Sequence, residues 1–221
     1  MTTTDTYNRF IIKINENATT DGLSCDKGRF VILFNKSTNK LIEHFLEKRF
    51  EDDIRYIQKI LVDNKKLSSS NKHLDHVDYP LPKDYFDNSH LYILASKGEC
   101  RKQKIDCFEI KSEDTNQILN DRNSSPSFKY RETPYRISSD KLNIYTADDF
   151  TIDDAYFSYY RYPKQIGLVN PENPESDFNN VDPEFDDKFI ERVIDLTASE
   201  FFLNSDNQKF QAEKTNSVQK P

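Results

Sequence analysis

The most regular hydrophobic pattern of the chain lies near its C-terminal end, over 182–203. Apolar residues recur there at intervals of three, four and seven positions, which is the spacing of one face of an α-helix. Asp182 is suited to cap the first turn, and Pro183, which has no N–H to lose, suits the first helical position. The pattern therefore predicts a helix whose apolar face packs against another helix. The residues of this face are Phe185, Phe189, Ile190, Val193, Ile194 and Phe201.

A second helical pattern covers 38–64, where apolar residues fall largely on one side and charged residues of both signs on the other. It predicts the longest helix of the chain, which packs against the helix at 182–203. Two short apolar segments precede it. Residues 9–14 are expected to form a short strand or an extended lead-in. Arg29–Phe34 remains open, because its β-branched and aromatic residues favour a strand whereas its place before a long helix favours a helix.

The pattern changes between residues 79 and 163, where short runs of β-branched and aromatic residues alternate with turn residues such as Lys97-Gly98 and Ser138-Ser139-Asp140. Because no long helix intervenes, these runs predict an antiparallel sheet or a small barrel. Residues 115–123 are expected to form a brief helical turn. The predicted strands are 90–96, 104–111, 129–130 with 135–138, 141–146, and 152–162.

These elements predict an α+β fold, in which N-terminal and C-terminal helices form a bundle around a central antiparallel β-domain. Pro80 and Pro82 follow a polar linker at 68–76 and mark the predicted start of the β-domain. The last residues carry one Phe and one Val among polar side chains, which is too little apolar area to fold alone, so they predict an extended arm. The predicted divisions are 1–78 (helical region), 79–163 (β-rich domain), 164–203 (loop and C-terminal helix) and 204–221 (flexible docking arm).

Composition narrows the possible partners. Hydrophobic residues make up 35% of the 221 residues, so the core is expected to be thin and to lean on neighbouring subunits. The formal net charge of −7 disfavours a dedicated nucleic-acid binder, because neutralising phosphates needs a basic surface. Three cysteines without a regular framework predict reduced thiols in a cytosolic setting. We expect neither a membrane-spanning segment nor a signal peptide.

The residue types needed for catalysis or metal binding are present, but not in the required patterns. His73 and His76 form a soft-ligand cluster only together with Cys100 and Cys107, and the spacing of these cysteines is wider than in zinc sites. We therefore expect no metal site and no cofactor. The acidic residues Asp148, Asp149, Asp153 and Asp154 are expected to be solvated turn residues rather than ligands of a divalent ion. No serine, cysteine or histidine lies in a motif of nucleophilic catalysis, and the chain is not expected to be an enzyme.

The aromatic run from Tyr156 to Tyr162 has two interpretations. In a strand, Tyr156, Ser158, Tyr160 and Tyr162 would face one side. Tyrosines beside Arg161 are typical of surfaces that stack single-stranded bases, but they are equally suited to a strand that is packed on both faces. The acidic composition favours the packed strand.

Several short motifs occur in a recognisable order. Leu81–Tyr85 follows the helical region, Ser125–Phe128 and Asn143–Tyr145 lie in the strand-rich middle, and Tyr159–Pro163 ends it. Asp182–Glu184 then opens the last helix. In this order and spacing, the chain from about residue 10 to residue 215 resembles the head–tail connector (neck ring) proteins of tailed bacteriophages, especially those of crAss-like phages.

The resemblance implies a structural virion protein, made in the cytoplasm of the host bacterium, that forms a ring of about twelve identical subunits below the portal. Such a ring bridges the portal protein and the neighbouring neck or tail rings, and genomic DNA passes through it without sequence-specific binding. The C-terminal arm is expected to dock on the portal. The resemblance implies no role for the acidic loop at 171–182. The interface residues that we expect are Lys209, Phe210 and Gln211 of the arm, and Tyr160, Arg161 and Tyr162 of the aromatic run.

Two other functions remain open at this stage. A tail-accessory or host-interacting phage protein would use the β-domain as a binding module. A hydrolase would need a nucleophile or a metal set that the motifs do not supply.

Overall fold

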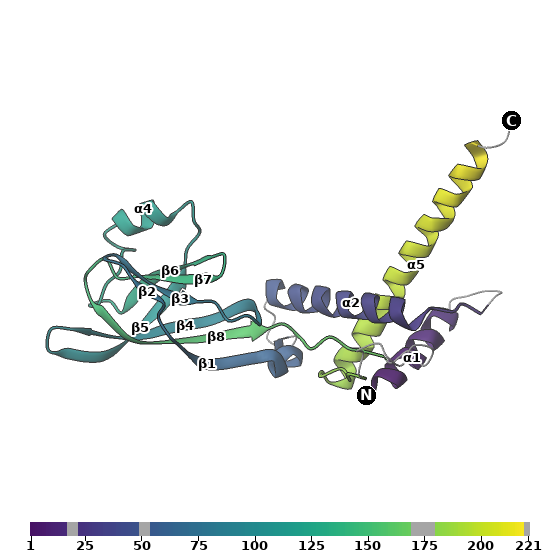
Figure 1. Cartoon of the computed structure of the whole chain (residues 1–221), viewed down its shortest axis with the longest axis horizontal. Helices are drawn as coiled ribbons and strands as arrows, with labels where there is room; N and C mark the ends of the chain where they lie inside the picture. The colour runs from purple at the N-terminus through teal and green to yellow at the C-terminus, as the bar shows by residue number, and fades with distance from the viewer. Residues whose placement is uncertain (17–21, 49–53, 169–179, 219–221) are drawn as a thin grey trace. The chain divides into compact units, whose positions relative to one another are not determined.

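The computed structural model describes residues 1–16, 22–48, 54–168 and 180–218, and it describes side chains as far as Leu203. The chain divides into two compact units. A helical unit consists of residues 1–59 and 163–221, and a β unit consists of residues 60–162. Figure 1 shows both units and labels their elements. The α+β fold class is thereby confirmed, with helices from both chain ends packed together and a central, mostly antiparallel sheet.

Among the residues that the structure describes, the helical unit contains the α-helices α1 (Thr3–Glu16), α2 (Lys27–Lys48) and α5 (Asp187–Val218). Both α1 and α2 pack against α5. Large rings from all three helices meet in their shared core, together with aliphatic residues such as Ile14, Ile42 and Ile190. Phe10 of α1 contacts Phe30 of α2 and Phe201 of α5, and Phe45 of α2 contacts Phe189 of α5. These five rings are all at most 4% exposed.

The helix α1 was not predicted from the hydrophobic pattern, which assigned residues 9–14 to a strand or an extended segment. Its polar start explains why it forms. The Asp5 backbone N–H donates to Thr2 Oγ1 (3.2 Å), and the Thr2 hydroxyl donates to Asp5 Oδ2 (2.6 Å). This reciprocal pair satisfies free groups of the first turn in the manner of a capping box. Phe10 and Ile14, four residues apart, are then fully buried on the face toward α5.

Asp182 caps a different helix from the one predicted. Its Oδ1 accepts hydrogen bonds from the backbone N–H (2.8 Å) and the hydroxyl (3.0 Å) of Thr3, at the start of α1. The helix α5 begins later, at Asp187, and its first backbone bond runs from Ile190 N–H to the Asp186 carbonyl. Asp182 therefore joins the two ends of the chain, because it lies before the C-terminal helix and stabilises the N-terminal one.

Arg29–Phe34, for which the sequence left strand and helix open, is part of the helix α2. Asp26 begins this helix by accepting from the Arg29 backbone N–H (3.1 Å). The predicted helix over 38–64 was wrong in its second part. The helix α2 ends at Lys48, residues 49–53 lie outside the described residues, and a 3-10 helix, η1, follows over Arg55–Ile60. The next residues, Leu61–Leu67, form a strand, because their apolar positions pair with another strand instead of continuing a helical stripe.

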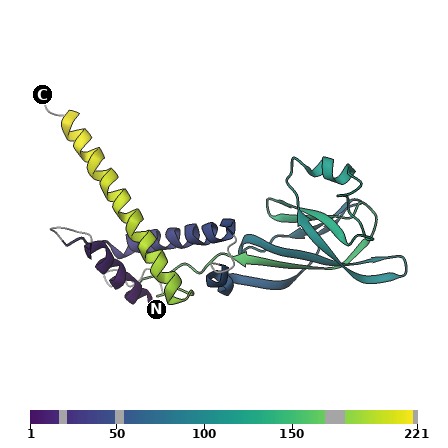
Figure 2. The same ribbon diagram turned by 180° about the vertical axis from the view of Figure 1, so that it is seen from behind.

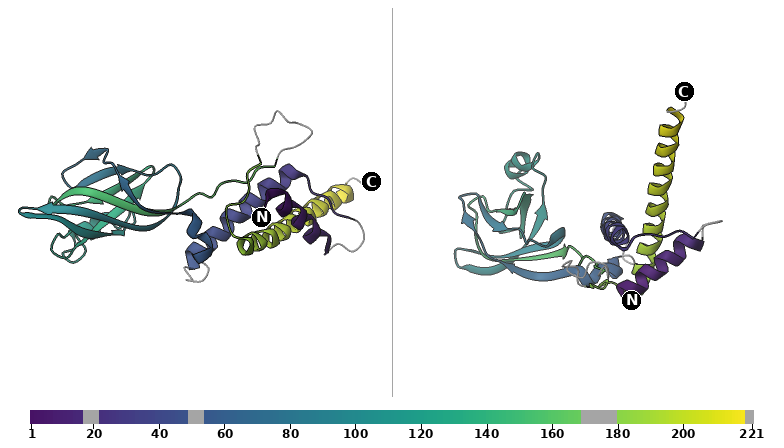
Figure 3. Two further views of the ribbon diagram at one scale, coloured as in Figure 1. Left: turned by 90° about the horizontal axis from the view of Figure 1, so that it is seen from below. Right: turned by 45° about the vertical axis from the view of Figure 1, so that its right-hand side comes forward.

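The predicted end of the last helix at Leu203 was also wrong, since α5 continues to Val218. Neither Gly nor Pro occurs between Glu184 and Lys220, and the segment after Leu203 includes three Gln and three Lys, which favour helices. In Figures 1 and 3 the distal part of α5 extends beyond α1 and α2, and no other described helix of this unit lies beside it. Residues 204–218 correspond to about 22 Å of helix at 1.5 Å per residue.

Eight strands and one short helix build the β unit. The strand order in the sheet is β1-β8-β4-β5-β6-β7-β3-β2, and all neighbours are antiparallel except β5 and β6. The helix α4 (Thr115–Asn120) lies in the connection that makes this parallel crossover possible. The strands are β1 (Leu61–Leu67), β2 (Asn71–Lys72), β3 (His76–Pro80), β4 (Tyr85–Lys97), β5 (Cys100–Glu109), β6 (Glu132–Ser138), β7 (Lys141–Tyr145) and β8 (Thr151–Arg161).

The sheet is curled around one hydrophobic core, as Figure 2 shows from behind. Side chains from strands that are far apart in the strand order meet in this core, including Leu67 of β1, Val77 of β3 and Ile144 of β7. Phe157 and Tyr159 of β8 are fully buried in it. The curl follows from this burial, because the strands at the two ends of the sheet cover the same set of apolar side chains.

The β unit begins at Ile60, earlier than the predicted boundary at residue 79. The stretch 68–76, predicted to be a linker, contains β2 and the first residue of β3. The prolines that suggested a boundary are compatible with a strand, because Pro80 is the last residue of β3, where it lies opposite Lys141. Leu81 N–H then bonds to the Asp140 carbonyl. The end of the unit at Tyr162 lies next to the predicted end at residue 163.

Candidate functional site

The first half of α5 is committed to the helical unit. Phe189, Ile190 and Val193 are fully buried, and ion pairs line both edges of the contact. On the α1 side, Lys13 pairs with Asp195 (2.8 Å) and Arg9 with Glu191. On the α2 side, Lys40 and Lys36 both approach Glu200, a carboxylate that is only 8% exposed. The main apolar face of this half is therefore used within the helical unit.

The second half of α5 is the candidate for binding another protein. Leu203, the last residue with a described side chain, is 66% exposed. The predicted interface residues Lys209, Phe210 and Gln211 follow it on the same helix. Their backbone is helical instead of extended, and their side chains lie outside the description. Residues three and four apart lie on one side of a helix. A partner that binds Phe210 is therefore expected to contact residues at those spacings as well.

The aromatic run of β8 is mostly internal. Tyr159 is fully buried, and its hydroxyl donates to Asp84 Oδ1 (2.8 Å) and accepts from Lys65 Nζ (3.0 Å). Of the three predicted interface residues, Tyr160 is buried, Arg161 is partly exposed and Tyr162 is 53% exposed. The Tyr162 ring packs edge-on against Phe86.

The outer face of the sheet carries a second aromatic pair. The Tyr156 ring stacks on the Tyr92 ring, with 5.1 Å between centroids. Lys104 lies 4.5 Å from the centroid of the Tyr92 ring, which adds a cation–π contact. The acidic chain charge and the burial of Tyr160 both favour the packed-strand interpretation over base stacking.

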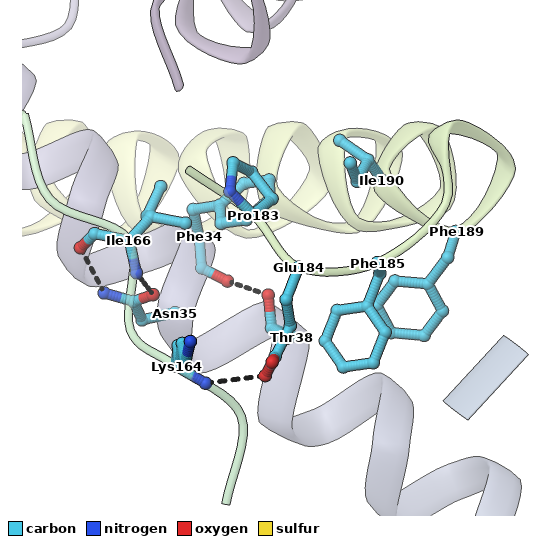
Figure 4. Close-up of a pocket in the computed structure, with 10 residues that line it drawn as sticks. All are labelled: Phe34, Asn35, Thr38, Lys164, Ile166, Pro183, Glu184, Phe185, Phe189 and Ile190. Atoms are coloured by element: carbon cyan, nitrogen blue, oxygen red, sulfur yellow. Dashed lines mark hydrogen bonds between the residues drawn. The ribbon is translucent and has the colours of Figure 1, made fainter. Parts of the chain in front are cut away.

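A small pocket in the helical unit is a packing joint, the place at which the segment after Pro163 is held on α2 (Figure 4). The segment that enters this unit after Pro163 runs along α2, and Asn35 holds it by two bonds. Asn35 Oδ1 accepts from Ile166 N–H (2.9 Å), and Asn35 Nδ2 donates to the Ile166 carbonyl (3.3 Å). Lys164 N–H donates to Glu184 Oε1 (2.8 Å) from the other side. Phe185 and Phe189 close the joint, so it offers no space for a ligand.

The acidic residues Asp149, Asp153 and Asp154 of the β unit are already engaged. Asp149 accepts from the Phe128 backbone N–H (3.0 Å) and pairs with Lys97. Asp154 pairs with Lys66, and Asp153 accepts from the Ser96 hydroxyl. Most of the acidic loop at 171–182 lies outside the described residues. The expectation that all of them are turn residues was wrong for Asp153 and Asp154, which lie in β8, whereas Asp149 lies in the turn before this strand.

A group of side chains with metal-binding chemistry lies instead at the hairpin of β2 and β3. Among the described residues, His73, His76 and Asp78 are brought together so that one ligand atom of each lies within 4.8 Å of the others. The two imidazole rings stack, with centroids 4.4 Å apart and an angle of 18° between planes. His76 Nε2 lies 3.3 Å from Asp78 Oδ1, and His73 Nε2 lies 3.5 Å from Asp78 Oδ2.

The local fold explains this arrangement. His73 N–H bonds to the His76 carbonyl (2.9 Å), so the two histidines flank a two-residue turn formed by Leu74 and Asp75. His76 and Asp78 are two residues apart on β3, and strand side chains at this spacing share a face. The Asp75 carbonyl accepts from Thr146 N–H (2.7 Å), which ties the turn to the end of β7.

The surroundings fix the Asp78 carboxylate. It is 7% exposed, and Asn143 of β7 donates to its Oδ1 (2.7 Å). Lys141 Nζ lies 3.7 Å from its Oδ2. Burial raises the pKa of Asp78, but the bond from Asn143 and the nearby positive charges outweigh this effect, so the pKa lies below its ordinary value. The carboxylate is therefore held in one orientation and in its charged form at neutral pH.

The sequence analysis considered the two histidines together with Cys100 and Cys107 and expected no metal site, whereas the structure places them beside Asp78. Cys100 is exposed at one end of β5, and Cys107 lies further along the same strand. The local spacing His73-x-x-His76-x-Asp78 was the signal that could have found the cluster. It was missed because residues 68–76 were interpreted as a polar linker, in which side chains have no fixed positions.

The three thiols differ in their surroundings. Burial raises the pKa of Cys25, and burial together with the nearby Asp106 raises the pKa of Cys107 above its usual range. Cys100 is exposed. Because the thiolate is the reactive form, we expect one thiol to react quickly with a disulfide reagent in the native protein and three in denaturant. Counting released chromophore checks this, and a Cys100→Ser variant should lose the fast phase. A fast phase that persists in this variant would contradict the assignment.

Comparison with models of protein families and with curated proteins finds no match to this chain. No helix among the described residues has the length and the apolar character needed to cross a membrane.

Proposed function

We propose that the protein is a structural component of a phage neck, in which identical subunits form a ring below the portal and connect it to the tail. The observation that carries the proposal is the division of α5. Its first half fills the core of the helical unit, and its second half extends beyond α1 and α2 (Figure 3). Residues 204–218 of this second half correspond to about 22 Å of helix. A helix that is anchored at one end and free at the other is suited to reach a neighbouring protein.

The motif order described above supports the same assignment, since it resembles connector proteins over nearly the whole chain. The helical unit also offers a rigid base, because Asp182 and the Asn35 joint tie distant parts of the chain to it. The net charge of −7 is compatible with a channel wall along which DNA slides without binding. Identical subunits in a ring would meet through two different surfaces, and the ring closes only if the rotation between them does.

The test is the mass of the purified chain, alone and mixed with the portal protein of the phage that encodes it. We expect a monomer alone and a defined multiple on the portal, which would also give the copy number. Absence of any complex with the portal or with a neighbouring neck protein would overturn the connector function. Particles that assemble completely without the protein would instead favour an accessory or host-interacting role for the β unit.

A further inference from the structure

We propose that His73, His76 and Asp78 bind one divalent transition-metal ion, which fastens the hairpin of β2 and β3. The three side chains converge from both sides of one tight turn. They supply two imidazole nitrogens and a carboxylate, which is a ligand set that Zn²⁺ and its neighbours in the first transition row prefer.

The two nitrogen–oxygen distances fit ligands of a common ion better than they fit hydrogen bonds, and all three ligand atoms lie within 4.8 Å of one another. Zinc binds imidazole nitrogen and carboxylate oxygen at about 2.0–2.2 Å, so two ligands of a tetrahedral ion lie roughly 3.4 Å apart. The two nitrogen–oxygen distances in this cluster are 3.3 and 3.5 Å. Both exceed the usual range of an N–H···O bond, which ends at about 3.2 Å.

The tautomer of His76 strengthens this inference. His76 Nδ1 lies 2.7 Å from Asp75 Oδ1, and a carboxylate in this position requires Nδ1 to carry the proton. In the tautomer that carries a proton at Nδ1 alone, the lone pair of Nε2 points at the Asp78 carboxylate, so two acceptors face each other. A cation between them removes this conflict. An aspartate behind a ligating histidine is also the usual outer partner of protein metal sites.

The carboxylate is prepared for the same role. Asp78 is nearly buried and is oriented by Asn143, so little side-chain entropy is lost when it binds an ion. His73, whose side chain is 47% exposed, is the ligand that is able to adjust. The fourth position of a tetrahedral ion would face solvent on this side and would hold water.

Two positive side chains on the same face oppose the ion. Lys141 Nζ already lies 3.7 Å from Asp78 Oδ2, and Arg136 lies opposite Asn143 in the register of β6 and β7. Lys141 is 44% exposed on a flexible side chain, so it is able to move away when an ion binds. Removing its charge is therefore expected to tighten binding.

The experiment titrates the full chain with Co²⁺ and then displaces it with Zn²⁺. We expect one Co²⁺ per chain, visible absorption bands of a tetrahedral ion with nitrogen and oxygen ligands, and a higher melting temperature with Zn²⁺. His73→Ala should weaken binding by at least about tenfold and Asp75→Asn by about 10–100-fold, since outer partners have effects of that size. Lys141→Met should bind more tightly than the natural chain.

The matched control is His90→Ala. His90 also lies near an aspartate, with 3.6 Å between its Nε2 and Asp106 Oδ1. Among the described residues, however, it belongs to no group of three possible metal ligands. Binding in this variant should be unchanged. His73 is exposed, so His73→Ala is expected to fold, and circular dichroism verifies this.

Three results would overturn the site. Titration without any bound Co²⁺ would mean that a proton on His76, instead of a metal, separates the two acceptors. Binding that is unchanged in His73→Ala would place the ion elsewhere. Thiolate-to-cobalt absorption bands would assign the ion to Cys100.

Discussion

Truncation after Leu203 is expected to abolish binding to the portal protein while the rest of the chain stays folded. The core of the helical unit is complete at Phe201, which is 4% exposed and contacts Phe10. The removed residues carry Phe210, the one aromatic side chain after Phe202, which is the expected apolar anchor of the complex. We expect the affinity for the portal to fall at least about 100-fold, which is roughly 2.8 kcal/mol.

Two measurements separate this effect from misfolding. Sedimentation or light scattering of the mixture reports the complex, and thermal melting of the truncated chain reports the fold. A shorter truncation, which removes only residues 219–221 and leaves α5 whole, is the matched control and should bind normally. A chain that ends at Leu203 and still binds the portal with unchanged affinity would show that α5 is not the docking element.

Phe189→Ala is expected to lower the free energy of unfolding of the helical unit by about 3–5 kcal/mol, because the lost ring leaves a cavity. Phe189 is fully buried, and its ring packs on Phe185 with centroids 4.3 Å apart and edge-on to Phe45 at 6.0 Å. Phe189 therefore lies in the contact between α5 and α2. A loss of this size is a large fraction of the stability of an ordinary domain.

Denaturant unfolding followed by far-ultraviolet circular dichroism measures this loss. Ile32→Ala on α2 is the matched control, since Ile32 is 70% exposed and its truncation should change the free energy of unfolding by no more than about 0.5 kcal/mol. Equal effects of the two substitutions would contradict the packing described here. A melt with two transitions should show the effect in one transition only, because the β unit has its own core.

The periodic parts of the sequence predicted the fold well. The apolar stripe of 182–203 was found because burial on one side of a helix leaves a regular spacing, and every one of its predicted apolar residues is buried. The strands β4, β5, β7 and β8 were found for a similar reason. Each has β-branched or aromatic residues between clear turns, such as the turn at Gly98, where φ is +58°.

The failures have physical causes as well. The helix α1 has only two fully buried apolar residues, so its stripe is too short to see without its cap at Thr2 and Asp5. The strand β1 follows helical residues directly, and its apolar positions continued the helical spacing by coincidence. The capping role of Asp182 depends on a contact with Thr3 across the whole chain, which no local pattern contains.

The candidate site was half visible in the sequence. His73 and His76 were noticed because their spacing is short, but the role of Asp78 depends on a turn that was not predicted. Orientation of this carboxylate by Asn143 joins residues that are far apart in the chain, and only the pairing of β3 with β7 brings them together. A ligand set is thus recognisable from spacing alone only when the secondary structure beneath it is already correct.

The pairing of β1 with β8 has a further consequence. Leu61 and Tyr160, near the two ends of the β unit, are partners in register, and neighbouring strands lie about 4.8 Å apart. The chain therefore leaves the helical unit and returns to it through two adjacent strands. Because the entering and leaving strands are neighbours, a short turn would be enough to replace the whole β unit. The β unit therefore has the connections of an exchangeable cassette. The whole sheet could be lost, acquired or replaced during evolution, or by design, while α1, α2 and α5 still pack together.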